Sequence, residues 1–327
     1  MSNVREMRSS IWLGRAALVL LGALLLAVIF SPRNHNSTLW LRTLHDAAHG
    51  PIFGCIALAL LYLLRTQPWL TRLSLTTCYV TAFVLAVGLG LFTEVAQHFT
   101  GRDASFKDLA MDGLGAAAAL LLFATVDPRR NELPRAHRAI WVAPAILALA
   151  LMSWPLAQVA QAYVNRAQGF PVLADFTDEI GTRFVRPRRA RASLIEVEEQ
   201  WAERPRERAL RVQLFGRGWP GLHLAETEPN WRGYRALVLD LVNPMDTPLE
   251  LTVRIDDRKH DGLDPNDRYN ATYTLPPLAR TALKIDLADV AGAPERRTLD
   301  LGRIARVVMF RPEASGETFY FVRAWLE

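Results

Sequence analysis

Long uncharged runs mark the first half of the chain. They occupy residues 16–32, 50–64, 73–93, 113–126 and 139–165. A helix needs about 20 residues to cross a bilayer, so the second and fourth runs are long enough only with the polar residues that precede them. The pattern therefore predicts five membrane-spanning helices, at about residues 11–31, 46–64, 73–93, 108–126 and 139–163.

Beyond residue 165 the apolar residues follow the spacing of β-strands. Residues 249–255, Leu-Glu-Leu-Thr-Val-Arg-Ile, alternate between apolar and polar side chains, as a half-buried strand does. Similar short runs occupy residues 193–197, 210–215, 236–242, 272–275, 282–287, 305–310 and 318–325. We therefore expect a chain of more than one domain. An all-α polytopic membrane bundle at 1–165 is followed by an all-β jelly-roll sandwich at 166–327.

Charge divides the chain at the same place. Residues 1–165 hold 13 Lys and Arg against 8 Asp and Glu, whereas residues 166–327 hold 25 of each. The net positive charge thus lies in the loops of the membrane domain, which argues against nucleic acid as a partner. Eight basic residues in the N-terminus and in the second and fourth loops, against four in the other two, predict a cytoplasmic N-terminus. Five spans then place residues 166–327 outside the inner (plasma) membrane, in the periplasm.

Polar residues gather at the ends of the predicted spans that face outwards. A charge near the hydrocarbon costs about a few kcal/mol, so such residues are functional candidates. Asp46 and His49 lie three positions apart on one helical face, as do Glu94 and Gln97. We predict one outer-leaflet site that binds a polar or phosphorylated head group. Its predicted residues are Asp46, His49, Glu94, Gln97, Arg102, Asp108 and Asp112.

Several roles are open for these side chains. Glu94 fits interhelical hydrogen bonding, substrate binding or acid–base catalysis. Asp46 and His49 fit helix N-capping, a histidine–carboxylate pair or metal ligation, and Asp108 fits capping of the fourth span. Arg102 fits either a grip on phosphate or neutralisation of the acids. In a catalytic site, Glu94, Asp108 and His49 are the candidate acids and bases.

No sequence motif indicates a cofactor. The chain has no nucleophile elbow, Walker loop, dinucleotide fingerprint or HExxH segment. Cys55 and Cys78 both lie in apolar runs and supply neither a disulfide framework nor a cysteine metal site. Residues 256–267 are rich in carboxylates, but their spacing differs from that of an EF-hand loop, which favours a solvated loop over a calcium site. We expect no cofactor and no metal, and the motifs leave open whether the chain is an enzyme.

Residues 40–125 carry three motifs in a recognisable order. HDAAH at 45–49 leads into a span, EVAQHFTGR at 94–102 ends the next, and DASFKD at 103–108 with DGLG at 112–115 opens the fourth. In this order they resemble the VanZ-like membrane family, which was named for tolerance to the glycopeptide teicoplanin. The chain departs from the usual family pattern at Ala47, where lysine is usual, and at Asp112, where asparagine is usual.

Residues 230–321 carry a second set of matching pieces. They are NWRGYRALVLD at 230–240, NDRY at 266–269, LKIDL at 283–287, LDLGRI at 299–304 and FYF at 319–321. In order and spacing these pieces resemble the galactose-binding-like jelly rolls of some carbohydrate-binding modules, which implies a glycan ligand. The aromatic side chains available for stacking on sugar rings are Trp219, Trp231, Tyr234 and Tyr269. Core packing is the alternative for Trp231 and Tyr234.

Together these patterns predict a cell-envelope membrane protein. Its partners are the lipid bilayer, an envelope glycan bound by the outer jelly roll, and a lipid-linked precursor or head group bound by the membrane site. The alternative is a membrane hydrolase or transferase that acts on a lipid-linked envelope substrate by carboxylate acid–base chemistry. A transporter and a purely structural tether for the jelly roll are further alternatives.

Overall fold

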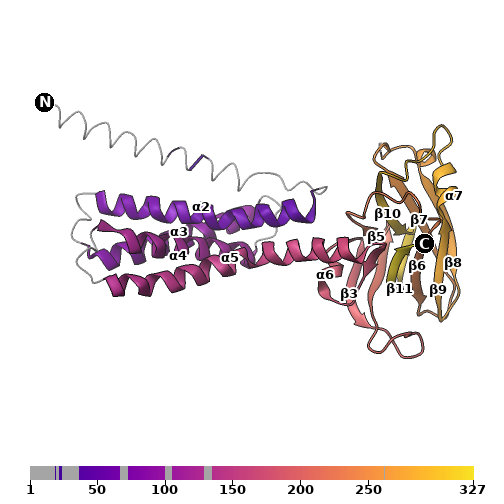
Figure 1. Cartoon of the computed structure of the whole chain (residues 1–327), viewed down its shortest axis with the longest axis horizontal. Helices are drawn as coiled ribbons and strands as arrows, with labels where there is room; N and C mark the ends of the chain where they lie inside the picture. Colours follow the sequence, from indigo (N-terminus) through magenta and orange to yellow (C-terminus); the bar gives the residue numbers. More distant parts are fainter. Residues whose placement is uncertain are drawn as a thin grey trace. The chain divides into compact units, whose positions relative to one another are not determined.

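The computed structural model describes residues 19, 22–23, 37–66, 73–99, 105–128, 135–260 and 262–327. In this part of the chain a helical region is followed by antiparallel β-sheets (Figure 1). Contacts within the chain gather into two compact units, Met1–Val159 and Ala160–Glu327. The predicted order, helices first and an all-β region after them, is confirmed.

Within the described residues, four helices are long and apolar enough to cross a membrane. They are α2 (Leu39–Thr66), α3 (Leu75–Phe99), α4 (Phe106–Val126) and α5 (Arg135–Gly169). Each covers most of one predicted span, but α2 begins earlier than residue 46. It does so because Thr38 caps it, with the Thr38 Oγ1 atom accepting a hydrogen bond from the Leu41 amide at 3.2 Å. The remaining predicted span, 11–31, lies outside the described residues apart from positions 19 and 22–23.

Helices α2 and α4 meet through their backbones. A Cβ atom on Gly115 would lie 1.9 Å from the carbonyl oxygen of Gly50. A Cβ atom on Gly54 would lie 3.0 Å from the carbonyl oxygen of Gly115. Small residues permit such close approach because no side chain separates the two helices. An apolar core that includes Phe53 and Leu61 packs beside this contact.

Polar contacts join the last turn of α2, the C-terminal end of α4 and the N-terminal part of α3. Arg65, in the last turn of α2, forms an ion pair with Asp127, which follows α4. The hydroxyl of Tyr79 on α3 donates to Asp127 Oδ2 at 2.8 Å. Because Asp127 is buried, these two donors satisfy a carboxylate that would otherwise be costly to bury. Helices α2, α3 and α4 are therefore tied together at this end by polar groups.

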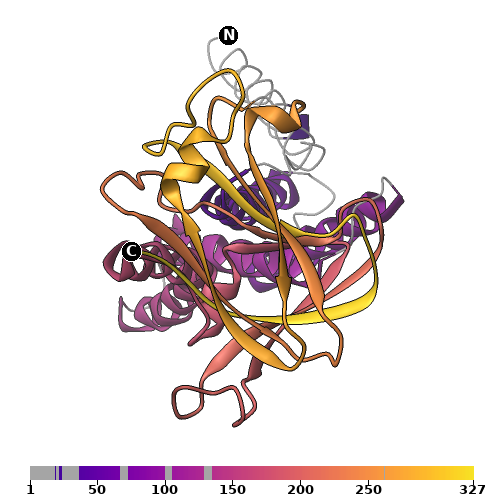
Figure 2. The ribbon, with the colours of Figure 1, turned by 90° about the vertical axis from the view of Figure 1, so that its right-hand side faces the viewer.

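The second unit contains two antiparallel sheets (Figure 2). One has the strand order β3-β4-β11-β6-β9, with β1 paired to β11, and the other has the order β2-β5-β10-β7-β8. The strands are β1 (Val172–Asp175), β2 (Val185–Arg188), β3 (Ala190–Glu196), β4 (Arg208–Arg217), β5 (Gly221–Leu224), β6 (Ala236–Asn243), β7 (Leu249–Asp257), β8 (Tyr269–Leu275), β9 (Ala279–Asp286), β10 (Ile304–Phe310) and β11 (Glu313–Leu326). Short helical segments are α6 (Glu179–Thr182), η3 (Pro265–Asp267) and α7 (Leu287–Gly292).

All eight predicted strands are present in the structure. Three further strands, β1, β2 and β5, have four residues each, which is too short to show a clear alternation in the sequence. One apolar core contains residues of β4, β6 and β11 from one sheet and of β5, β7 and β10 from the other. The two sheets therefore pack face to face as a sandwich.

Part of the outer face of the six-stranded sheet is covered. Strand β6 is buried at every position, and Trp201, in the segment 197–207, packs in one cluster with Val242 at the end of this strand. Arg280 on β9 fixes this segment through hydrogen bonds to the Trp201 carbonyl oxygen at 2.6 Å and to Glu207 at 2.7 Å. The same guanidinium group donates to Asp240 on β6 at 2.6 Å. The segment 197–207 is thus fixed over this part of the six-stranded sheet.

Candidate functional site

A cleft of about 610 Å³ lies over the outer face of the five-stranded sheet. Its floor includes His223, Val308, Arg254 and Asn270, which are direct neighbours across β5, β10, β7 and β8. Alternate residues of these strands, such as Leu222, point into the core, so the floor residues point outwards. The remaining lining residues are Arg188, Trp219, Thr252, Gly262, Leu263, Pro265, Arg268, Arg306 and Phe310.

Trp219 presents an aromatic ring at this cleft. Its backbone has a φ of +64° and follows Gly218 with a φ of +86°, so two consecutive residues are left-handed. A bulky residue rarely adopts this conformation, and such outliers cluster at functional sites. The Trp219 side chain is 53% exposed, and its ring lies edge-on to that of Phe310 with 5.5 Å between centroids. The turn therefore holds a flat apolar surface open to solvent.

Positive charge dominates the cleft. Four lining side chains are arginines, at positions 188, 254, 268 and 306, and no acidic residue is among the described residues that line it. Asp256 is fully buried and accepts hydrogen bonds from the Nε atoms of Arg254 at 2.9 Å and Arg306 at 2.8 Å. One carboxylate is thus shared by two guanidinium groups, which leaves the pair with a net positive charge.

His223 supplies a neutral polar group at the centre of the floor. Burial, and after it the positive charges of Arg188, Arg306 and Arg254, lower the pKa of His223 to about 4. At pH 7 its imidazole is therefore uncharged and has one hydrogen-bond donor and one acceptor. The cleft thus combines an aromatic surface, neutral polar groups and cations.

The four aromatic residues that were predicted to contact sugars lie in different environments in the structure. Trp231 is 0% exposed and its Nε1 atom donates to the Glu228 carbonyl oxygen at 2.7 Å, so of its two expected roles the structure shows core packing and not a sugar contact. Tyr269 is also buried, with its hydroxyl 2.5 Å from that of Tyr273, so the predicted sugar contact is wrong for Tyr269. Tyr234 is half-buried and packs against the core. Trp219 alone among the four lines the cleft.

The acid-rich segment 256–267 uses its carboxylates for ion pairs. Asp257 accepts two hydrogen bonds from Arg297, at 2.6 and 2.9 Å, and Asp267 forms a further ion pair with the same arginine. Burial alone would raise the pKa of Asp257, but the hydrogen bonds from Arg297 and from the Asp300 amide hold it below its usual value. Within the described residues, no group of three or more His, Cys, Asp or Glu side chains could hold a metal ion.

In the helical unit, four of the predicted membrane-site residues come together. The Nδ1 atom of His49 lies 3.1 Å from Asp112 Oδ1, which links α2 to α4. Glu94 and Asp108 also lie close enough to His49 for their charges to interact with it. All four side chains are buried. They form a compact polar cluster, named here the carboxylate cluster, beside the glycine contact of α2 and α4.

Two carboxylate oxygens of this cluster are unsatisfied. Among the described residues, no group hydrogen-bonds to Asp112 Oδ2 or Glu94 Oε1, although both atoms are buried. A Cβ atom on Gly90 would lie 2.7 Å from Asp112 Oδ2, so the glycine makes room for this carboxylate. Unpaired buried polar atoms are costly and rare in native structures. The two oxygens therefore mark the carboxylate cluster as a second candidate site.

The remaining predicted residues differ in their placement. Ser105, and not Asp108, caps α4, because the Ser105 Oγ atom accepts a hydrogen bond from the Asp108 amide at 3.3 Å. Asp46 lies inside α2, so it does not cap that helix; it pairs with Lys107 Nζ at 3.5 Å. The side chain of Gln97 and the whole of Arg102 lie outside the described residues.

Sequence reasoning missed the arginines of the cleft, whereas it included the four residues of the carboxylate cluster. The arginines of the cleft look like ordinary outward residues of a strand, and only strand pairing brings them together. One signal was present: Gly50 and Gly54 have the four-residue spacing of close helix contacts. The pairing of this glycine motif with Gly115 depends on which helices are neighbours.

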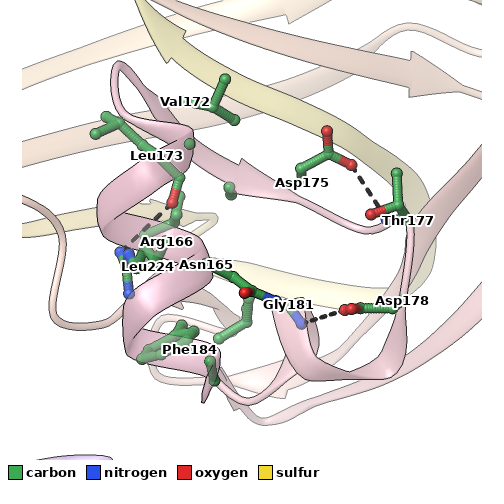
Figure 3. A pocket seen from close by; sticks show the side chains of 14 residues that line it. Asn165, Arg166, Val172, Leu173, Asp175, Thr177, Asp178, Gly181, Phe184 and Leu224 are labelled. Atoms are coloured by element: carbon green, nitrogen blue, oxygen red, sulfur yellow. Dashed lines mark hydrogen bonds between the residues drawn. The ribbon is translucent and has the colours of Figure 1, made fainter. Parts of the chain in front are cut away.

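A smaller cavity of about 230 Å³ lies within the second unit, between the end of α5 and β1 (Figure 3). Its polar side chains are engaged locally. Arg166 donates to the Leu173 carbonyl oxygen at 3.4 Å, and the Asp175 carboxylate accepts from the Thr177 amide at 3.1 Å. The guanidinium of Arg166 also lies over the Phe184 ring, 4.4 Å from its centroid. These contacts hold the last turn of α5 to the first strands of the sandwich.

No protein-family model matches the chain, and no match is found among curated proteins. Similar solved structures include the family 11 carbohydrate-binding module from Clostridium thermocellum in complex with a β-1,3-1,4-mixed-linked tetrasaccharide. It is 15% identical, with a TM-score of 0.36, covering 47% of this chain and 93% of that one. The CBM22-1 xylan-binding domain of Paenibacillus barcinonensis Xyn10C is 13% identical, with a TM-score of 0.31, covering 44% of this chain and 86% of that one.

An exo-β-agarase is also similar over part of its length. It is 15% identical, with a TM-score of 0.38, and the match covers 48% of this chain. The match covers only 25% of the agarase chain. Carbohydrate-binding modules thus recur among the structural neighbours of this chain.

Proposed function

We propose that this chain is a cell-envelope membrane protein that binds glycan through the cleft on the five-stranded sheet. The observation that carries the proposal is Trp219, whose left-handed backbone keeps its ring exposed at the cleft. Flat aromatic rings stack on sugars, while polar groups such as Asn270 and Thr252 hydrogen-bond to sugar hydroxyls. The cleft volume of about 610 Å³ is within the range of ligand sites, about 300–1,000 Å³.

We further propose two domains, 1–165 in the membrane and 166–327 outside it. The basic residues of alternate loops support a cytoplasmic N-terminus and a periplasmic sandwich. In that orientation the cleft faces the compartment in which envelope glycans are found.

The test is a glycan array probed with the full-length protein in detergent micelles. The array includes mixed-linkage β-glucan, xylan, agarose, polygalacturonate and alginate. We expect binding to at least one polymer and a loss of about tenfold in affinity for Trp219→Ala, because stacking contributes about 1 kcal/mol beyond the buried area.

The matched control is Trp154→Ala, which removes an equally large ring that is 62% exposed on α5 and far from the cleft in sequence. It should leave the affinity unchanged. If the wild-type protein binds no glycan, or if Trp219→Ala binds as tightly as wild type, the proposal fails.

A second function is favoured by the carboxylate cluster. We propose that it binds the head group of a lipid-linked precursor, or acts on it as a hydrolase or transferase, with Glu94 or Asp108 as acid or base and Arg102 on phosphate. The unsatisfied oxygens of Glu94 and Asp112 support a site that accepts a donor from a ligand. The VanZ-like motifs lie in the same helices.

Phosphate release from a polyprenyl pyrophosphate, in the same micelles, tests this second function. Glu94→Gln keeps the shape of the side chain and should abolish turnover without lowering the melting temperature. Absence of turnover in the wild-type protein would remove the enzymatic form of the proposal, and absence of binding to the same lipid would remove both forms.

A further inference from the structure

The charge of the cleft exceeds what binding a neutral sugar requires. Arg254 and Arg306 share the buried carboxylate of Asp256, so one of their two charges is left uncompensated. Arg188 is exposed at the end of β2 and adds a third guanidinium to the lining. A neutral glycan needs hydrogen-bond donors and acceptors, and it gains little from several uncompensated cations.

Arg268 gives the clearest sign of an unfilled role. Its Nε–H group is buried and, among the described residues, donates to no acceptor. Burial lowers the pKa of Arg268, and the nearby positive charge of Arg254 acts in the same direction. A guanidinium that is half-buried among other cations is stabilised when an anion reaches it.

Arg254 and Arg306 meet at Asp256, but Arg188 lies farther along the strands. Arg188 lies beside Gly221, which pairs with Phe310 at one end of β10, whereas Arg306 lies four residues earlier on the same face. At a rise of about 3.3 Å per residue, these positions are separated by about 13 Å along the strand direction. An extended ligand with several anionic groups fits this spacing better than a single small ion.

The positive charge is local. Residues 166–327 hold equal numbers of basic and acidic residues, so the sandwich lacks the domain-wide positive charge that is typical of nucleic-acid-binding proteins. The aromatic surface of Trp219 at the same cleft fits a ring-containing ligand. Both observations favour a saccharide over a nucleic acid.

We infer that the cleft selects an acidic glycan, a saccharide chain that carries carboxylate, sulfate or phosphate groups. Trp219 stacks on a sugar ring, His223 and Asn270 bind hydroxyls, and Arg188 and Arg268 bind the anionic groups. This inference rests on the proposed function, because it names the ligand class of the same cleft.

The experiment compares each acidic polymer with its own neutral form. Full-length protein in detergent micelles is immobilised and tested against polygalacturonate, alginate and chondroitin sulfate, and against the same polymers after carboxyl reduction and desulfation. We expect at least one acidic polymer to bind tenfold or more tightly than its neutral form, since hydrogen bonds to charged groups contribute about 1.5–3 kcal/mol. This preference should shrink as salt is raised.

Three variants assign the preference to residues. Arg188→Ala and Arg268→Ala should each lower the affinity for the acidic polymer about tenfold and leave the neutral form unaffected. Arg217→Ala removes an arginine that is 90% exposed outside the cleft and should change neither. Trp219→Ala should weaken both forms, since it removes the stacking surface. Circular dichroism spectra check that each variant is folded.

The outcomes separate the inference from the function on which it rests. If neutral and acidic forms bind equally and both depend on Trp219, the inference fails and glycan binding stands. If no polymer binds, both fail. If a single-stranded oligonucleotide binds more tightly than every acidic polymer, the cleft recognises nucleic acid and the inference is overturned.

Discussion

At the scale of single residues, arginine determines how acids are buried in the sandwich. Asp240, Asp256 and Asp257 are almost fully buried, and each accepts hydrogen bonds from an arginine. A buried carboxylate without such a partner would cost several kcal/mol, about as much as a whole domain can spare. Arg254 and Arg306 both hold the buried Asp256 and line the cleft, whereas Arg188 and Arg268 line the cleft without holding one of these acids.

Replacing Arg280 should destabilise the sandwich. Arg280→Ala would leave Glu207 and Asp240 buried without their shared cation. We expect a loss of about 3 kcal/mol in the free energy of unfolding. Urea unfolding of the full-length protein in detergent, followed by tryptophan fluorescence, measures it. The control Arg217→Ala should change the free energy by less than about 0.5 kcal/mol, because its side chain is exposed. A loss below about 1 kcal/mol for Arg280→Ala would contradict this account.

At the scale of elements, the pairing of neighbours decides what each element shows to solvent. Strand β6 is buried at every position, with the segment 197–207 packed against one end of it, whereas β7 is buried at alternate residues over most of its length and offers Arg254 to the cleft. Helices α2 and α4 approach through glycine, which places His49 beside Asp112. Neither site exists on one element alone.

Replacing Gly115 should weaken the packing of α2 against α4. In Gly115→Ala the new methyl group would overlap the Gly50 backbone, so α2 and α4 must separate. We expect a loss of about 1–3 kcal/mol, seen as a lower melting temperature by circular dichroism in detergent. Gly88→Ala is the matched control in α3, since a Cβ atom there meets nothing within 4 Å. It should be neutral or stabilising, as alanine favours helix. Equal melting temperatures for the two variants would show that the glycine contact is unimportant.

At the scale of the whole molecule, the chain joins a helical unit to a β-sandwich with its own core. The four described apolar helices account for the first, and the eleven strands account for the second. The proposed role depends on the two lying on defined sides of a membrane.

Membrane orientation provides the prediction at this scale. Single cysteines are introduced as Ser193→Cys on β3 and Thr66→Cys at the end of α2, in a chain whose Cys55 and Cys78 are replaced by alanine. Both positions are exposed. In right-side-out membrane vesicles, an impermeant maleimide should label residue 193 at once and residue 66 only after permeabilisation, because basic loops stay in the cytoplasm. The reverse pattern would overturn the proposed orientation.

Much of the fold could be predicted because its signals are local. The four described helices follow continuous apolar runs, and β7 follows a strict alternation. Four-residue strands such as β2 carry too few residues for either signal. For the sites, the carboxylate cluster could be predicted from the cost of charges near apolar runs. The sequence could not decide whether Trp231 and Tyr269 face the core or a ligand, because an aromatic residue looks the same in sequence in either position.

The sequence by itself determines the class of each half of the chain, its charge and its candidate polar residues, since these depend on near neighbours along the backbone. Tertiary structure alone decides which strands and helices lie side by side. It fixes the segment 197–207 over part of one sheet through Arg280 and forms a cleft on the other sheet beside Trp219. It also sets His49 against Asp112 across a contact that only glycine allows. Sites built from residues far apart in sequence require long-range packing, and local patterns do not encode which surfaces meet.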